Sequence, residues 1–294
     1  MISSRAYTTL TSMAIAAIVA TLAWITFAPS GFVGAPIAMS VIIVLVYLTL
    51  AGRTNPGDEI WVAAEPPAQH IRLMVLILVL ICLQFLSAVI LQRLNQLDFI
   101  KTTLLSTVVW TLCPLLALKL GLVRWPKRVG RPRQAEVLAI SAIAITIAVA
   151  FCALTMASYA DVVPRRLPGG LPADIAAVAV GATMEEIVFR VLLLTALMAV
   201  TGSRFKALVL SATIFAACHV PTAVAAPIAM LDWGVAADYL RDLAPQMVWK
   251  IGFGLLLGAL WIRTGSLTLV AAFHAIANMG PVWKAGFGAL TGDA

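Results

Sequence analysis

The sequence predicts an all-α protein, a polytopic bundle of about nine transmembrane helices, with eight as the alternative count. Three observations support this fold class. Hydrophobic residues make up 62% of the chain and charged residues 11%, whereas about 25% of a soluble domain is charged. The mean hydropathy is +1.01. Apolar stretches of about 20 residues, the length of helix that crosses a bilayer, recur along the whole chain.

Nine such stretches are expected to span the membrane. They cover residues 7–28, 32–51, 72–92, 102–122, 137–159, 172–199, 205–223, 244–262 and 266–285. The first five carry almost no ionisable side chain, so we expect them to form scaffold or lipid-facing helices. The chain therefore divides into N-terminal scaffold helices over 1–160 and a second part over 161–294, whose last four helices carry the polar groups.

The net charge of +7 is explained by basic loops on the cytoplasmic side of a membrane, so we expect no nucleic-acid partner. Five Lys and Arg residues lie in the loop 123–136, which places this loop in the cytoplasm. With nine spans, the basic loop residues divide eleven against six in favour of a cytoplasmic N-terminus. The four cysteines lie in apolar stretches without a CxxC pair, which argues against a disulfide framework.

Two segments between the expected spans have patterns of their own. Residues 53–71 are polar and rich in proline, which predicts an interfacial loop with Trp61 as an anchor at the lipid headgroups. Over 226–243, apolar residues recur at helical spacing. This spacing predicts either a short amphipathic helix at the outer interface or a loop that packs on the bundle.

The sixth expected span contains three charged residues, Glu185, Glu186 and Arg190. A charged side chain at the centre of a bilayer costs about 2.5–3.5 kcal/mol, so such a group indicates a functional site. Glu186 and Arg190 are four residues apart and share a helix face, and we expect them to form a structural ion pair. Glu185 points about 100° away and is free for another partner.

Two more motifs with polar residues occur in the apolar C-terminal third, Phe215 with His219 and His274 with Asn278, and we expect Phe215 to support the site. His274 and Asn278 are four residues apart and project from one helix face. Because lipid offers no hydrogen-bond partners, we expect these groups and the two glutamates to meet in one polar cavity. Pro221 removes a helical hydrogen bond, which predicts a kink within one turn of His219.

These residues suit the hydrolysis of a carbonyl compound such as a peptide bond. A glutamate away from bulk water holds a proton more tightly and suits a general base, and His219 could share the activated water. His274 and Asn278 carry donors for a developing oxyanion. Glu185, His219 and His274 would also form a zinc-binding set with an open water position, an alternative that their spacing leaves open. The sequence contains no HExxH or GxSxG motif.

The ordered motifs Glu185-Glu186-x-x-x-Arg190, Phe215-x-x-x-His219 and His274-x-x-x-Asn278 resemble the three motifs of the CAAX prenyl endopeptidase and bacteriocin-processing family. Its members are intramembrane endopeptidases, also called type II CAAX proteases. The resemblance covers roughly residues 170–285. It implies a helical bundle with a cavity open to the cytoplasm and no metal cofactor. In that cavity Glu185 and His219 activate water, and His274 and Asn278 stabilise the oxyanion.

We therefore predict an intramembrane endopeptidase in the plasma (inner) membrane of a prokaryote. Its expected partners are membrane lipid and a membrane-associated protein or peptide that serves as its substrate; the oligomeric state stays open. One alternative is a noncatalytic binding or immunity protein of the same fold. The other is a proton-coupled transporter, in which the carboxylates would relay protons. No inverted repeat of the kind found in many transporters is evident in the sequence.

Overall fold

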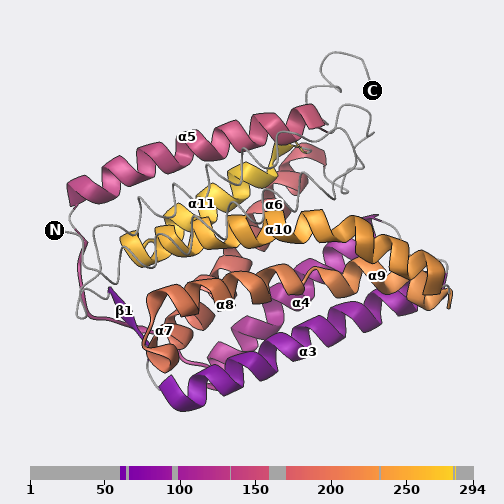
Figure 1. The fold of residues 1–294 in the computed structure, drawn as a ribbon, viewed down its shortest axis with the longest axis horizontal. Helices are drawn as coiled ribbons and strands as arrows, with labels where there is room; N and C mark the ends of the chain where they lie inside the picture. Colours follow the sequence, from indigo (N-terminus) through magenta and orange to yellow (C-terminus); the bar gives the residue numbers. More distant parts are fainter. Residues whose placement is uncertain are drawn as a thin grey trace.

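A computed structural model describes residues 60–63, 66–94, 99–132, 134–158, 170–231, 233–280 and 282. Within these ranges the chain is mostly helical, which confirms the predicted all-α class (Figure 1). The helices are α3 (Pro66–Arg93), α4 (Phe99–Lys119), α5 (Gln134–Ser158), α6 (Gly170–Glu186), the π-helix η1 (Ile187–Leu194), α7 (Thr195–Thr201), α8 (Arg204–Ala217), α9 (Val220–Ala229), α10 (Trp233–Thr264) and α11 (Leu267–Asn278). Two short strands, β1 (Trp61–Val62) and β2 (Lys127–Arg128), complete the described elements.

The described helices are those of an integral membrane protein. Three of them contain segments long and apolar enough to cross a membrane: Ala68–Arg93, Gln134–Ala153 and Gln246–Thr264. Two shorter apolar helices cover Leu105–Lys119 and Leu267–Asn278. The expected spans 7–28 and 32–51 lie outside the described residues, so the predicted count of nine is not confirmed.

Two of the expected spans differ from continuous α-helices. The span expected at 172–199 consists of α6, η1 and α7 in succession. The span expected at 205–223 is interrupted, because α8 ends at Ala217 and a turn at Cys218 and His219 leads into α9. Pro221 lies in the first turn of α9, where its missing N–H breaks no helical hydrogen bond. The kink predicted near His219 is therefore a break between two helices.

The segment 226–243 is neither an isolated amphipathic helix nor a loop, which corrects both predictions for it. Its first residues complete α9, and the chain reverses at Met230 and Leu231, where Leu231 adopts a φ of 58°. The remaining residues begin α10, which continues without interruption to Thr264. The helical spacing in this segment thus belongs to the first turns of a long helix that packs against α9.

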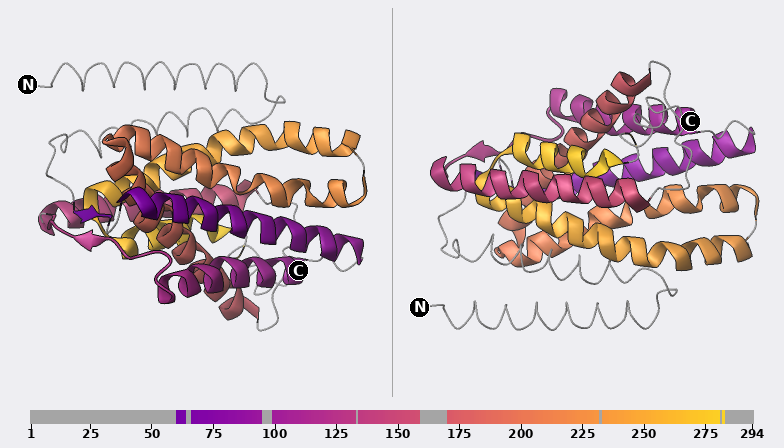
Figure 2. Two further views of the ribbon diagram at one scale, coloured as in Figure 1. Left: turned by 90° about the horizontal axis from the view of Figure 1, so that it is seen from below. Right: turned by 90° about the horizontal axis from the view of Figure 1, so that it is seen from above.

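The helices pack side by side in an elongated bundle (Figure 2). α10 lies along α8 and α9, α11 lies between α5 and α6, and α3 packs against α9. One core of buried side chains draws on α3, α4, α5, η1, α8, α10 and α11. The described scaffold helices α3, α4 and α5 therefore pack directly on the polar part of the chain, and the division at residue 160 stays a prediction. Large apolar side chains such as Leu78, Leu112 and Ile143 are exposed, as expected for helices that face lipid.

Several turns meet at one end of the bundle. β1 pairs with β2 in antiparallel orientation, and Arg263 at the end of α10 forms an ion pair with Glu136 of α5. The ring of Trp61 stacks on Trp261 with centroids 5.7 Å apart, and its indole N–H donates to the carbonyl of Gly265 at 3.0 Å. Trp61, predicted as an anchor in an interfacial loop, thus packs on α10 and connects β1 to the turn that follows α10.

Substitution of Gly265 is expected to lower the thermal stability more than substitution of Gly202, which has the same backbone conformation. Gly265 and Gly202 both have a φ of +59°, which costs a non-glycine residue about 1–2 kcal/mol. A Cβ at Gly265 would lie 2.5 Å from Ile60 Cγ2, whereas nothing lies within 4 Å at Gly202. In thermal unfolding of the purified protein in detergent, Gly265→Ala should therefore have a lower midpoint than Gly202→Ala. Equal midpoints would contradict the contact between Gly265 and β1.

Candidate active site

The two glutamates lie where an α-helix changes into a π-helix. α6 ends at Glu186 and η1 follows, with all eight of its residues buried. π-helical turns are often found at functional sites, and they leave backbone groups without their usual helical partners. Here Thr195 Oγ1 donates to the carbonyl of Arg190 at 3.4 Å, and Ser211 Oγ donates to the carbonyl of Phe189 at 2.9 Å. Nothing in the sequence pattern predicted this change of helix type.

Arg190 is buried among three helices with only 1% of its side chain exposed. Its Nη1 lies 3.2 Å from Glu186 Oε1, which is the ion pair expected from their spacing. Its Nη2 donates to the carbonyl of Gly254 on α10 at 3.5 Å, and its guanidinium carbon lies 4.5 Å from the ring centroid of Phe215 on α8. A cation over an aromatic face is attracted to the ring. Arg190 therefore connects η1 to α8 and α10.

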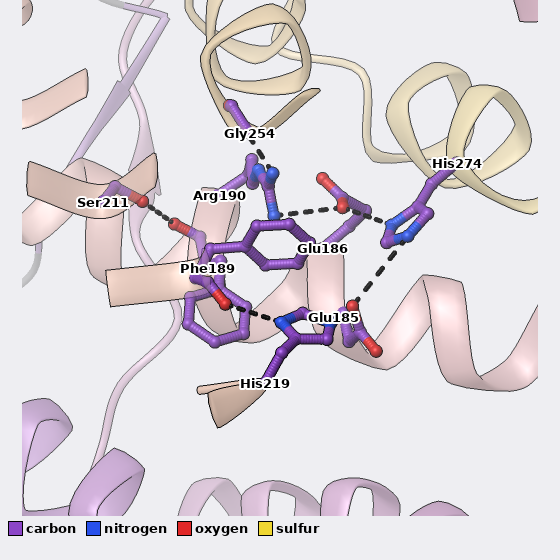
Figure 3. Close-up of polar contacts among 9 residues, drawn as sticks. Glu185, Glu186, Phe189, Arg190, Ser211, His219, Gly254 and His274 are labelled. Carbon is purple, nitrogen blue, oxygen red and sulfur yellow. Dashed lines mark hydrogen bonds and ion pairs between the residues drawn. The ribbon is translucent and has the colours of Figure 1, made fainter. Parts of the chain in front are cut away.

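Glu186 has a second partner that the sequence did not reveal. The carboxylate is fully buried, and its Oε1 accepts a hydrogen bond from His274 Nδ1 at 2.7 Å (Figure 3). The partners are 88 positions apart, so only the packing of α11 against α6 brings them together. Because the Nδ1 proton is held by Glu186, a neutral His274 ring has no proton on Nε2. The buried carboxylate thus fixes the orientation of His274.

Glu185 is the accessible carboxylate of the pair. Its side chain is 29% exposed, and its Oε2 lies 3.9 Å from His274 Nε2. The two nitrogens of His274 therefore face the two neighbouring glutamates, one buried and one open (Figure 3). An accessible carboxylate beside an oriented imidazole can bind a water molecule and take a proton from it.

His219 lies in the turn between α8 and α9. Its Nδ1 lies 2.9 Å from the carbonyl of Phe215 and donates to it, which leaves Nε2 of the neutral ring as an acceptor. The ring of Phe215 contacts both histidines, with centroid distances of 5.1 Å to His219 and 6.1 Å to His274. Phe215 thus contacts both imidazoles and also the guanidinium of Arg190.

Asn278 lies apart from this cluster. It is the last residue of α11, one turn beyond His274, and its side chain is exposed. Within the described part of the chain, no hydrogen bond joins Asn278 to Glu185, His219 or His274. The role expected for it at the oxyanion therefore stays a prediction.

The residues that the sequence offered as zinc ligands are close together without forming a ligand set. Glu185, His219 and His274 all belong to the cluster, but among the residues that the structure describes no group of three His, Cys, Asp or Glu side chains could hold a metal ion. The polar groups instead contact one another and the protein backbone.

One comparison with known proteins matches the part of the chain that carries this cluster. A family model described as type II CAAX prenyl endopeptidase Rce1-like matches residues 168–280. The match contains every residue of the cluster and leaves α3, α4 and α5 outside it. No curated protein and no solved structure matches the chain.

Removing Arg190 alone should destabilise the protein more than removing both charges of the ion pair between Glu186 and Arg190. Loss of one partner leaves a buried charge uncompensated, which costs about 3–5 kcal/mol. Arg190→Met should therefore unfold at a clearly lower temperature in detergent. The double variant Glu186→Gln with Arg190→Met should recover part of that loss, because neither charge remains.

Arg93→Met provides the control for this comparison, since Arg93 is an exposed residue in the last turn of α3. Exposed substitutions usually change stability by less than about 0.5 kcal/mol. A double variant less stable than Arg190→Met would show that the pair does not act through charge compensation.

Proposed function

We propose that this integral membrane protein is an intramembrane endopeptidase, because the model of a protease family, type II CAAX prenyl endopeptidase Rce1-like, matches residues 168–280. Its substrate would be a peptide bond in a membrane-associated protein or peptide. The observation that supports this proposal best is the arrangement of His274 between a buried carboxylate, Glu186, and an accessible one, Glu185. One carboxylate can orient the imidazole while the other is open to water.

In this proposal Glu185 is the general base. A water molecule bound to its carboxylate would also donate to the free Nε2 of His219, whose ring lies within electrostatic reach of Glu185. Glu185 takes a proton as the water oxygen attacks the carbonyl carbon, and the carbonyl oxygen becomes an oxyanion. Glu185 then passes the proton to the leaving nitrogen as the C–N bond breaks. The same carboxyl group thus serves as base and then as acid.

His274 would stabilise the charge that develops on the carbonyl oxygen. In its imidazolium form both ring nitrogens carry a proton, so Nδ1 can donate to Glu186 while Nε2 donates to the oxyanion. Glu186 offsets the charge of the imidazolium and prevents the ring from turning. Arg190 in turn keeps Glu186 in place. We propose Glu186 and Arg190 as positioning residues and, following the resemblance, retain Asn278 as a second donor to be tested.

Glu185→Gln is expected to abolish cleavage without unfolding the protein. Glutamine keeps the size of the side chain but cannot act as a base, and loss of a general base lowers rates by about 10²–10⁴-fold. The measurement compares newly formed peptide ends in membranes of cells that express the wild type or the variant. Ends that occur only with the wild type support the proposal and identify the substrate.

Asp238→Asn is the matched control, because it removes an exposed carboxylate from the same protein. It should give the same peptide ends as the wild type. If the wild type and Glu185→Gln give identical ends while both are folded and abundant, the protein is not an endopeptidase, and a noncatalytic binding role becomes the better explanation.

We further propose that the reaction needs no metal ion, since the cluster contains both a base and donors for the oxyanion. Cleavage by the purified protein should then persist after dialysis against 1,10-phenanthroline. Loss of activity that zinc alone restores would instead establish the alternative ligand set of Glu185, His219 and His274.

A further inference from the structure

In the proposed reaction, His274 donates to the oxyanion only while its ring is an imidazolium. In their neutral forms, His219 and His274 both carry their proton on Nδ1 and donate it to an oxygen of the protein. Neither ring then has a proton on Nε2. The guanidinium of Arg190 is buried beside Phe215 and occupied by Glu186. Asn278 is exposed at the end of α11. A further cation near Glu185 would supply a donor that is independent of the protonation of His274.

The antiparallel packing of α10 against α8 places Lys250 beside this site. A Cβ built at Gly258 would meet Leu208, and one built at Gly254 would meet Ala212 at 3.1 Å and Phe215 at 3.4 Å. Gly254 lies one turn before Gly258 on α10, and its neighbour Ala212 lies about one turn after Leu208 on α8. The two helices therefore run antiparallel in this register. Lys250 lies one turn before Gly254 on the same face, so its neighbour is the turn that carries His219.

The surroundings of Lys250 support this placement. It lies inside the apolar segment Gln246–Thr264, and its side chain is only partly exposed. A lysine in a membrane helix can extend its side chain to the interface and keep its charge in water. Lys250 is on the part of α10 that packs against α8 and α9, the two helices that flank His219. A lysine side chain at this position is long enough to reach the polar cluster.

We propose that Lys250 is a further catalytic residue, whose ammonium group stabilises the oxyanion that forms on the carbonyl oxygen of the scissile bond. This inference rests on the proposed endopeptidase function. It assigns to Lys250 a role that the three sequence motifs do not include.

The movement of charge during the reaction explains why a cation at this position would accelerate it. In this proposal the Lys250 ammonium lies near the carboxylate of Glu185 before the reaction. When Glu185 takes the proton from water, its negative charge disappears and an equal charge forms on the carbonyl oxygen. Lys250 keeps all its protons and changes its partner from the carboxylate to the oxyanion. An interaction with the oxyanion that is made only in the transition state lowers the barrier and not merely the binding energy.

The test measures kinetics of the purified protein in detergent, with a quenched fluorescent peptide that spans a cleavage site found from the new peptide ends. Lys250→Met should lower kcat by about 10²–10³-fold, the usual effect of losing one oxyanion donor. KM should change by less than about threefold. Lys250→Arg keeps a positive charge and should recover at least about tenfold of the lost kcat. Lys206→Met, which removes an exposed lysine from α8, is the matched control.

The outcomes separate this inference from the proposed function. Cleavage by the wild type and not by Glu185→Gln establishes the endopeptidase, whatever the Lys250 variants do. If Lys250→Met then retains the wild-type kcat, or raises only KM, Lys250 does not stabilise the oxyanion. Equal losses in the Met and Arg variants, with lowered thermal stability in both, would assign Lys250 a structural role and overturn the proposal. If Lys250→Met does not fold, Lys250→Gln replaces it with a polar side chain that has no charge.

Discussion

The buried carboxylate of Glu186 is the group on which the rest of the site depends. A charge inside a membrane protein must be compensated by protein groups, because lipid cannot hydrate it. Arg190 from the same helical segment and His274 from a distant helix both reach one oxygen of this carboxylate. The first contact neutralises the charge, and the second aligns a catalytic candidate. The same carboxylate therefore forms the structural ion pair and fixes the orientation of His274.

Two irregularities of the backbone shape the space around this carboxylate. The π-helix η1 follows Glu186 directly. Two buried hydroxyl groups, from Thr195 and Ser211, donate hydrogen bonds to its carbonyls. On the facing side, the break between α8 and α9 places His219 in a turn instead of a helix. Irregular backbone at membrane depth is tolerated where it is enclosed by protein or lines a polar cavity. Both departures from regular helix thus occur beside the polar cluster.

The helices outside the family match contribute to the packing of the site. Trp110 of α4 packs against Phe189 of η1, with ring centroids 5.7 Å apart. Phe151 of α5 contacts Phe273, the residue before His274, at 6.2 Å. Aromatic contacts of this kind add to the stabilisation that burial provides. Helices α4 and α5 therefore support the helical segment that follows the glutamates and the helix that carries His274, while they expose apolar side chains such as Leu112 and Ile143.

The amino-acid pattern alone predicted a helical membrane protein and singled out most residues of the candidate site. Long apolar stretches require helices in a membrane, and charges within such stretches are costly enough to indicate function. The spacing of Glu186 and Arg190 sufficed to predict their contact, because residues four apart share a helix face. Only the tertiary structure joined His274 to Glu186, exposed Asn278, interrupted the helix at His219 and brought Lys250 opposite that turn. These features depend on the register between helices far apart in the chain, and a local periodicity contains no information about that register.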